Sequence, residues 1–258
     1  MTYCLYDMHC HLDRIFDAER VAAEAEERGL AIFCAPVTPA GTLAARRALG
    51  RHVNVCVGVG LHPWWIDSGE CGEQEVLQAA RLIADARFVG EVGLDFGRAH
   101  VGSREAQVAA FERLIRDCAE RSVPGRVLSV HAVRSSGEIL DVLERCGLTG
   151  TGSDASCIFH WFSGTSDELA RLRCAGCYVS VNPMMLSTKR GREYARIMPV
   201  DRILLETDAP PGLDTPYTAG EIAAALETVL DTLAEIRHAD RAELARRIAD
   251  TSARLLGI

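Results

Sequence analysis

The chain has 258 residues, of which 48% are hydrophobic and only 6% aromatic, and its formal net charge is −8. The length lies in the range that α/β barrels reach as a single domain, and the acidic charge argues mildly against a large non-specific nucleic-acid surface. No apolar run reaches the roughly 18 residues of a membrane span, and no basic region followed by an apolar stretch indicates a secretory signal. We therefore expect a cytoplasmic protein with no membrane partner.

Short apolar runs alternate with longer amphipathic ones along the chain. The apolar runs predict strands at 3–8, 30–35, 54–59, 87–92, 126–131, 156–160, 177–182 and 202–206. The segments that follow them predict helices at about 17–28, 40–50, 73–84, 103–122, 135–146, 166–175, 189–198 and 218–235, with a last helix at about 240–256. This repeat indicates a parallel sheet covered by helices. We predict a (β/α)8 TIM barrel, formed as a single domain over 1–258 with an extra C-terminal helix.

The first predicted strand runs into two histidines, His9 and His11, that lie two positions apart. Side chains alternate along a strand, so both imidazoles project from the same face, at a Cα separation of roughly 6.5–7 Å. Both could then bind one metal ion. Two unrelated surface histidines are the alternative, because a His-x-His pair often arises by chance.

Residues of the same ligand types stand at later strand ends, where the active site of a TIM barrel lies. They are Glu91, His131, His160 and Asp208. Four histidines and two carboxylates exceed the needs of one tetrahedral ion and suit two divalent ions. We assign the first ion to His9, His11 and Asp208, and the second to His131 and His160, with Glu91 bridging them.

Such an ion pair lowers the pKa of a shared water and holds the attacking and leaving oxygens. Asp208 is then the expected general base, and Glu91 is the second residue that we expect at the reacting centre. Imidazole ligands favour zinc, manganese or cobalt, whereas many nucleases use magnesium, so the identity of the two ions stays open.

With these motifs the chain resembles the TatD family of metal-dependent hydrolases, within the amidohydrolase superfamily. The resemblance covers essentially the whole chain, and its motifs stand at 9–13, 60–63, 90–95, 160–164 and 206–210, with the strand end at His131. It implies a metal-dependent barrel, usually described as a deoxyribonuclease, with metal roles for the six residues assigned above. Segments 125–131, 160–164 and 180–186 carry a narrower resemblance, to the TatD-like nuclease subunit of the Qat anti-phage defence system. It implies that other Qat subunits are partners.

Three further residues could contact a phosphate, and each has a structural alternative. His62 could face a phosphate or leaving group, or simply pack on Pro63. Arg134 could hold a phosphate through two hydrogen bonds, or be a solvated arginine. Lys189 opens a basic run after the seventh predicted strand, where TIM barrels often bind phosphate, although most charge runs are solvated faces.

Other candidates are aromatic or acidic. Trp161, together with Trp64 and Trp65, could stack on bases, and Trp161 could equally fill the core. Glu206 could orient a metal ligand or form a structural salt bridge, and Asp95 could orient a histidine ligand or stabilise a turn.

Ten cysteines raise the alternative of disulfides or a zinc site. Most lie in apolar runs, where a free cysteine packs as a small hydrophobe. Cys174 and Cys177 have the Cys-x-x-Cys spacing, but no second pair completes a zinc site. We predict buried thiols.

The leading hypothesis is a divalent-metal-dependent deoxyribonuclease, with DNA as substrate and anti-phage defence as its setting. One alternative is a small-molecule amide, ester or phosphoester hydrolase of the same superfamily, which the ligand set does not distinguish from a nuclease. Another is a weakly active binding subunit of a defence complex.

Overall fold

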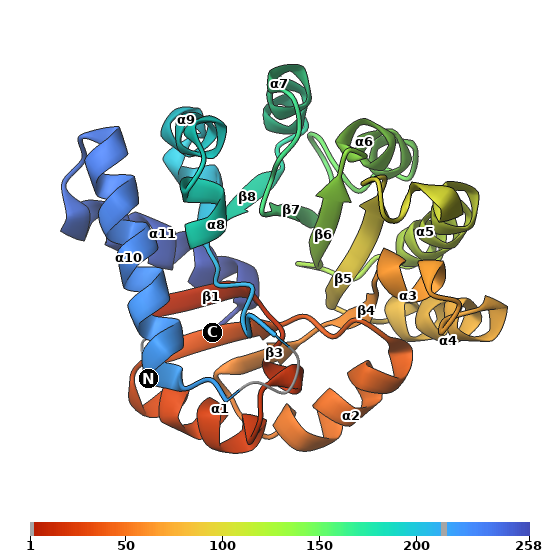
Figure 1. Ribbon diagram of the computed structural model, residues 1–258, viewed down its shortest axis with the longest axis horizontal. Helices are drawn as coiled ribbons and strands as arrows, with labels where there is room; N and C mark the ends of the chain where they lie inside the picture. Colours follow the sequence, from red (N-terminus) through yellow and green to blue (C-terminus); the bar gives the residue numbers. More distant parts are fainter. Residues whose placement is uncertain (1–2, 213–215) are drawn as a thin grey trace. The chain divides into compact units, whose positions relative to one another are not determined.

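A computed structural model describes residues 3–212 and 216–258 (Figure 1). Contacts along the chain group it into two compact units, each made of separate segments. Unit 1 comprises Met1–Cys34, Ala44–Val57 and Val179–Ile258, and unit 2 comprises Ala35–Leu43 and Gly58–Tyr178. The organisation as a single domain stays a prediction.

Unit 1 contains the first and last strands of the chain. They are β1 (Leu5–Cys10), β2 (Leu30–Cys34), β3 (Val55–Val57), β9 (Ile203–Leu205) and, apart from its first residue, β8 (Tyr178–Val181). β1, β2 and β3 pair in parallel, as do β8 and β9, and β9 lies beside β1. The helices are α1 (Ala18–Glu27), α8 (Pro183–Leu186), α9 (Lys189–Ile197), α10 (Ala219–Arg237) and α11 (Arg241–Leu256), with 3-10 turns η1 (Leu12–Arg14) and η3 (Val200–Arg202). Helices α10 and α11 both pack against β1, and all six residues of that strand are buried.

Unit 2 contains four parallel strands that pair in chain order. They are β4 (Val59–Leu61), β5 (Phe88–Asp95), β6 (Val127–Val133) and β7 (Ser156–His160). The helices are α3 (Pro63–Asp67), α4 (Glu73–Ala84), α5 (Arg104–Glu120), α6 (Ser136–Arg145) and α7 (Ser166–Cys174), with the 3-10 turn η2 (Val101–Ser103). Helix α2 (Pro39–Leu49) begins in unit 2 and ends in unit 1. In Figure 1, α5 and α6 accompany β5 and β6, against which they pack.

The predicted strands and helices are confirmed, with ends that shift by a few residues. The predicted strand 54–59 is divided at Gly58 into β3 and β4. We did not predict α3 or α8, because helices of five and four residues are too short to show a 3.6-residue period. Each begins with proline after a capping side chain, His62 and Asn182 respectively.

Two motif glycines permit close backbone packing in unit 2. A Cβ at Gly60 would lie 1.6 Å from the carbonyl oxygen of Pro36, and a Cβ at Gly93 would lie 2.0 Å from that of His131. Gly93 also has φ +152°, which disfavours any side chain. These glycines let the strands that carry Glu91 and His131 approach their neighbours.

All ten cysteines lie among the described residues as thiols without disulfides, and seven of them are buried as predicted. Across residues 3–212 and 216–258, no helix is both long enough and apolar enough to cross a membrane.

Candidate metal centre

In unit 1 the structure brings His9, His11 and Asp208 together. The Nε2 atoms of His9 and His11 lie 3.6 and 3.3 Å from Oδ1 of Asp208. One potential ligand atom from each residue lies within 4.8 Å of the other two. The two imidazole rings meet edge to face, with centroids 5.1 Å apart. Two imidazole nitrogens and a carboxylate oxygen form a donor set that fits a divalent transition metal.

Backbone hydrogen bonds join the end of β1 to the segment after β9. The amide of Asp208 donates to the carbonyl of His9 over 3.0 Å, and the amide of His11 donates to the carbonyl of Ala209 over 2.7 Å. Asp208 has φ +58°, an uncommon left-handed conformation for a residue with a side chain. The ligand candidates from opposite ends of the sequence are thus held by main-chain contacts.

A buried aspartate supports the same segment. Oδ1 of Asp7 accepts hydrogen bonds from the amides of Thr207 at 3.0 Å and His9 at 3.3 Å, and the Thr207 hydroxyl donates to Oδ2. Complete burial raises the pKa of Asp7 to about 7, although these hydrogen bonds act in the opposite direction. Asp7 was not among the predicted site residues, and its one signal was a carboxylate inside the apolar run that ends at Met8.

Glu206 and Lys189 belong to unit 1 as well. Glu206 is fully buried, and its carboxylate accepts hydrogen bonds from the hydroxyl of Ser180 and, over 2.9 Å, from Nδ2 of Asn182. Glu206 therefore connects the ends of β8 and β9. Lys189 is exposed at the first position of α9.

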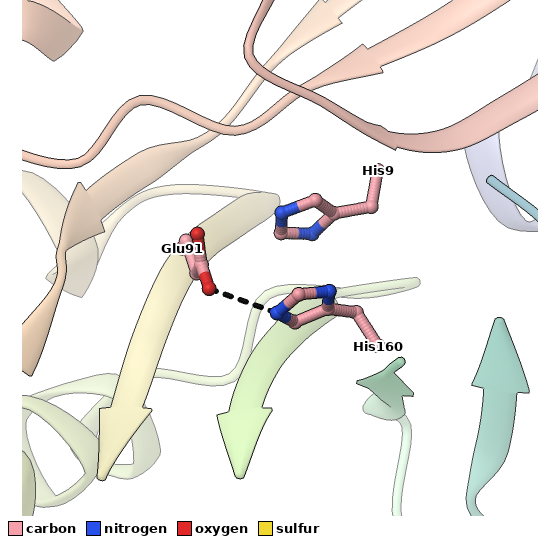
Figure 2. Close-up of side chains that lie close together, drawn as sticks. All are labelled: His9, Glu91 and His160. Atoms are coloured by element: carbon pink, nitrogen blue, oxygen red, sulfur yellow. Dashed lines mark ion pairs between the residues drawn. The ribbon is translucent and has the colours of Figure 1, made fainter. Parts of the chain in front are cut away.

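In unit 2 three histidines surround Glu91, and Figure 2 shows its ion pair with His160. Oε1 of Glu91 lies 2.9 Å from Nδ1 of His131, 2.9 Å from Nε2 of His160 and 3.2 Å from Nε2 of His62. Nδ1 of His131 and Nε2 of His160 are 3.4 Å apart. All four residues are buried, so this second cluster places several donor atoms around one carboxylate oxygen.

The contacts of His62 define its part in this cluster. Its Nδ1 accepts a hydrogen bond of 3.2 Å from the amide of Trp64, at the start of α3. A neutral imidazole that accepts at Nδ1 carries its proton on Nε2, so Nε2 can donate to Glu91. In this form His62 would orient the carboxylate of Glu91, and His62 also belongs to a group of possible metal ligands with Glu91 and His131. The sequence had offered a phosphate contact or packing on Pro63.

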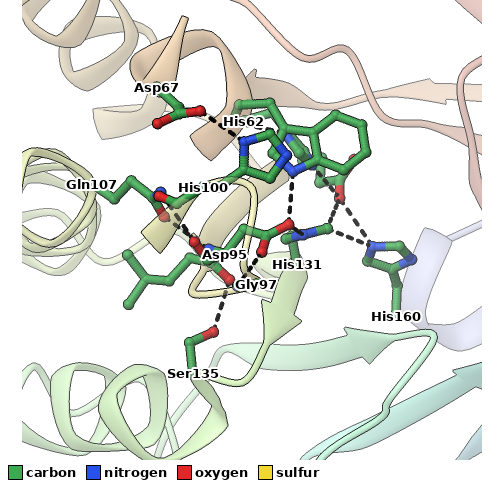
Figure 3. Close-up of polar contacts among 12 residues, drawn as sticks. His62, Asp67, Asp95, Gly97, His100, Gln107, His131, Ser135 and His160 are labelled. Carbon is green, nitrogen blue, oxygen red and sulfur yellow. Dashed lines mark hydrogen bonds and ion pairs between the residues drawn. The ribbon is translucent and has the colours of Figure 1, made fainter. Parts of the chain in front are cut away.

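Asp95 holds His131 from the other ring nitrogen (Figure 3). Nε2 of His131 lies 3.2 Å from Oδ2 of Asp95, and the indole N–H of Trp64 donates to the same oxygen over 2.7 Å. The amide of Gly97 donates to Oδ1 over 2.7 Å. This arrangement leaves Nδ1 of His131 facing Glu91, and a carboxylate behind an imidazole is the usual support of a histidine metal ligand.

The pKa values of this pair follow from the same contacts. Burial favours the neutral form of Asp95, but the hydrogen bonds with His131, Trp64 and Gly97 outweigh burial and lower its pKa. Burial likewise disfavours a charged His131, yet the contacts with Asp95 and Glu91 raise its pKa. Asp95 is therefore an anionic acceptor that fixes the ring.

Arg134 and Trp161 follow directly after β6 and β7. Both are exposed, and both have left-handed backbone conformations, with φ +53° and +41°. Such conformations are uncommon for residues with side chains and gather at functional sites. The structure thus places these two predicted substrate contacts at the strand ends that carry His131 and His160.

The sequence profile described as TatD related DNase matches residues 6–257. The chain belongs to the TatD family. Among its TatD relatives, the uncharacterized metal-dependent hydrolase YcfH of Escherichia coli is 28% identical, with 98% of this chain and 96% of the relative covered. The 3'-5' ssDNA/RNA exonuclease TatD of Erwinia tasmaniensis is 26% identical, with 94% of each chain covered.

Solved TatD structures show the same fold. The TatD homolog YJJV of Escherichia coli covers all of this chain with a TM-score of 0.80 at 21% identity, and all of that chain is matched. A TatD-family hydrolase of Entamoeba histolytica gives a TM-score of 0.78 at 16% identity over 99% of this chain and 98% of its own. These similarities confirm the predicted α/β fold of the TIM-barrel type. As a TatD protein the chain is a metal-dependent hydrolase, and the two clusters are its candidate metal-binding groups.

Proposed function

We propose that this TatD-family hydrolase is a deoxyribonuclease, a phosphodiesterase that uses divalent metal ions. The observation that carries the proposal is the convergence of His9, His11 and Asp208, whose donor atoms lie within 4.8 Å of one another. Names of relatives support the choice of substrate: the Erwinia relative is a 3'-5' ssDNA/RNA exonuclease and a fission yeast relative is a deoxyribonuclease. DNA is therefore the substrate that we would test first.

We propose one ion for each cluster. His9, His11 and Asp208 would hold the first ion, and His131 through Nδ1, with His160, would hold the second. Bound ions of this kind activate a water and neutralise charge on the phosphate. The bridging role of Glu91 stays a prediction from the sequence.

The side chains would then divide the work. Asp208 takes the proton of the attacking water, because its carboxylate is partly exposed and can meet solvent and substrate. Asp208 can return that proton to the departing oxygen. Arg134, exposed at the end of β6, and Lys189, exposed at the start of α9, would bind phosphates of the DNA strand, and Trp161 would contact a base. Glu206, which is buried, would position the segment before Asp208.

We place this activity in the cytoplasm. The ten cysteines of the chain carry thiols rather than disulfides, as is usual in a reducing compartment.

The test is cleavage of end-labelled single-stranded DNA by protein loaded with zinc, manganese, cobalt or magnesium in turn. We expect shortening of the DNA that depends on metal, and a loss of roughly 100- to 10,000-fold in kcat for Asp208→Asn. The matched control is Asp154→Asn, an exposed carboxylate in the loop before β7, which should keep full activity. Wild-type activity in a His9→Ala/His11→Ala variant would defeat the proposal.

The same preparation distinguishes the rival hydrolase. A panel of small esters, amides and phosphoesters is assayed beside the DNA. Turnover on this panel without cleavage of DNA would favour the small-molecule hydrolase.

We further propose that the enzyme serves as the nuclease subunit of a Qat-type anti-phage system. The support is the set of motifs at 125–131, 160–164 and 180–186. Cells that carry the defence genes with Asp208→Asn should lose protection against phage in a plating assay. Retained protection would favour a binding subunit whose chemistry is dispensable.

A further inference from the structure

We infer that Trp64 stacks on an unpaired nucleobase beside the phosphate that is cut. The inference rests on the proposed nuclease function and names the part of the strand that the site would recognise. It concerns unit 2 alone, and it depends on how Trp64 is held there.

Trp64 is joined to a proposed metal ligand through one carboxylate oxygen. Its indole N–H donates to Oδ2 of Asp95 over 2.7 Å, and Nε2 of His131 lies 3.2 Å from the same oxygen. The ring centroids of Trp64 and His131 are 6.1 Å apart. A base that covered Trp64 would therefore lie close to the reacting phosphate.

The orientation of the indole is fixed before any ligand arrives. His100 stacks on Trp64 with centroids 5.0 Å apart and an interplanar angle of 21°. His100 is itself anchored, because its Nδ1 lies 2.8 Å from Oδ2 of Asp67, as Figure 3 shows. A ring held by a hydrogen bond and by a second ring loses little conformational freedom when a base stacks on it.

Despite these contacts Trp64 remains 45% exposed, and Val101, the residue after His100, is 46% exposed. An aromatic ring that is exposed next to a proposed catalytic centre, and whose N–H is already hydrogen-bonded, offers an apolar surface on which a planar group can stack. A nucleobase is the planar group that a nuclease substrate offers, and stacking tolerates every base. Stacking also needs no positive charge, which suits a chain of net charge −8.

The inference predicts a preference for single strands, because a base in a duplex is already stacked on its neighbours. Two variants distinguish the stacking role of Trp64 from its role as hydrogen-bond donor to Asp95. Trp64→Phe keeps an aromatic ring and removes the donor to Asp95, whereas Trp64→Ala removes both. Loss of stacking and loss of support for Asp95 therefore give different results in the two variants.

The first experiment measures stacking on Trp64 in the absence of catalysis. In a Trp65→Phe/Trp161→Phe protein, Trp64 is the one remaining tryptophan, and its fluorescence is followed while a single-stranded oligonucleotide is added in EDTA. We expect saturable quenching by the normal oligonucleotide and little quenching by one in which all bases are replaced by abasic sites. Equal quenching by both oligonucleotides, or none by either, would overturn the inference.

The second experiment reads position. A single abasic site is moved along a 3'-labelled strand, and kcat/KM is measured with metal present. In the wild type we expect one position where the missing base slows cleavage by roughly 5- to 150-fold. In Trp64→Phe the missing base should still slow cleavage at this one position. In Trp64→Ala no position should stand out, and the intact strand should be cut more slowly by a similar factor.

Val53→Ala is the control, because it alters an exposed apolar side chain just before β3. It should leave the positional profile unchanged. If the wild type cuts no strand at all, the proposed function is wrong. If the wild type cuts and Trp64→Ala shows the same profile, the nuclease stands and the stacking inference is wrong.

Discussion

The two candidate metal-binding clusters are each supported by a buried aspartate, yet the pKa values of these aspartates shift in opposite directions. Burial raises the pKa of both carboxyls. For Asp7 burial dominates and brings the pKa to about 7. For Asp95 the hydrogen bonds from an imidazole, an indole and a backbone amide outweigh burial, and its pKa is lowered. Each carboxylate accepts three hydrogen bonds, so the difference comes from the deeper burial of Asp7 and from the imidazole of His131 that faces Asp95.

The two aspartates also act on different parts of the chain. Asp7 accepts hydrogen bonds from Thr207 and His9, so it holds the backbone next to Asp208. Asp95 contacts the ring of His131 directly. We therefore expect changes at Asp7 to appear mainly as lost stability, and changes at Asp95 mainly as lost metal affinity.

The largest effect should come from Gly93, which underlies the cluster of unit 2. In Gly93→Ala the new Cβ would meet the carbonyl oxygen of His131 at 2.0 Å, in a backbone conformation that disfavours a side chain. We expect a loss of more than about 3 kcal/mol in the free energy of unfolding, or no folded protein. Denaturant unfolding measures it. Gly102→Ala, which meets no atom within 4 Å, is the control, and equal stability of the two variants would show that the packing of β5 on β6 is looser than described.

Asp7→Asn should have the next largest effect. The amide cannot accept both the Thr207 hydroxyl and the two backbone amides as the carboxylate does. We expect the free energy of unfolding to fall by about 1–3 kcal/mol, with metal content preserved once the protein is folded. Asp250→Asn, at an exposed ion pair with Arg246, should change stability by less than about 0.5 kcal/mol. If Asp7→Asn is as stable as the control variant, Asp7 does not stabilise the backbone next to Asp208.

Asp95→Asn tests whether Asp95, unlike Asp7, acts mainly on metal affinity. The ring of His131 would lose its anionic partner, and we expect metal affinity to fall by about 10- to 100-fold. Isothermal titration of metal into metal-free protein measures this change. Unaltered affinity, with stability lost instead, would mean that Asp95 supports the fold in the manner of Asp7.

The smallest effects should come from the exposed cations. Arg134→Ala and Lys189→Ala should each weaken DNA binding only modestly and reduce the slope of log K against log salt by about 1, as loss of one phosphate contact does. Arg51→Ala, which changes an exposed arginine paired with Glu19 before β3, should leave that slope unchanged. If the slope stays unchanged in Arg134→Ala or in Lys189→Ala, the side chain that was removed makes no phosphate contact.

The strands and long helices were predictable because their apolar residues recur with periods that the fold imposes. The same logic pointed to His9, His131 and His160 as residues at strand ends. It failed for α3 and α8, where a proline and a capping side chain act over a single turn. Sequence periodicity carries no information on such short turns.

The supporting residues of the site were harder to predict. Asp7 was not predicted, whereas Asp95 was predicted either to orient a histidine ligand or to stabilise a turn. Their partners, Thr207 and His131, lie 200 and 36 residues away in the chain. The stack of His100 on Trp64 joins helix α3 to the residue just before η2, and no local pattern links the two. Contacts of this kind become visible only in three dimensions.

The most direct test of the account counts metal ions. Elemental analysis of the wild type should give two equivalents, and the His9→Ala/His11→Ala and His131→Ala/His160→Ala variants should each lose at least one while keeping their circular dichroism spectra. A folded double variant that retains both equivalents would show that its cluster binds no metal, and would contradict the assignment of one ion to each cluster.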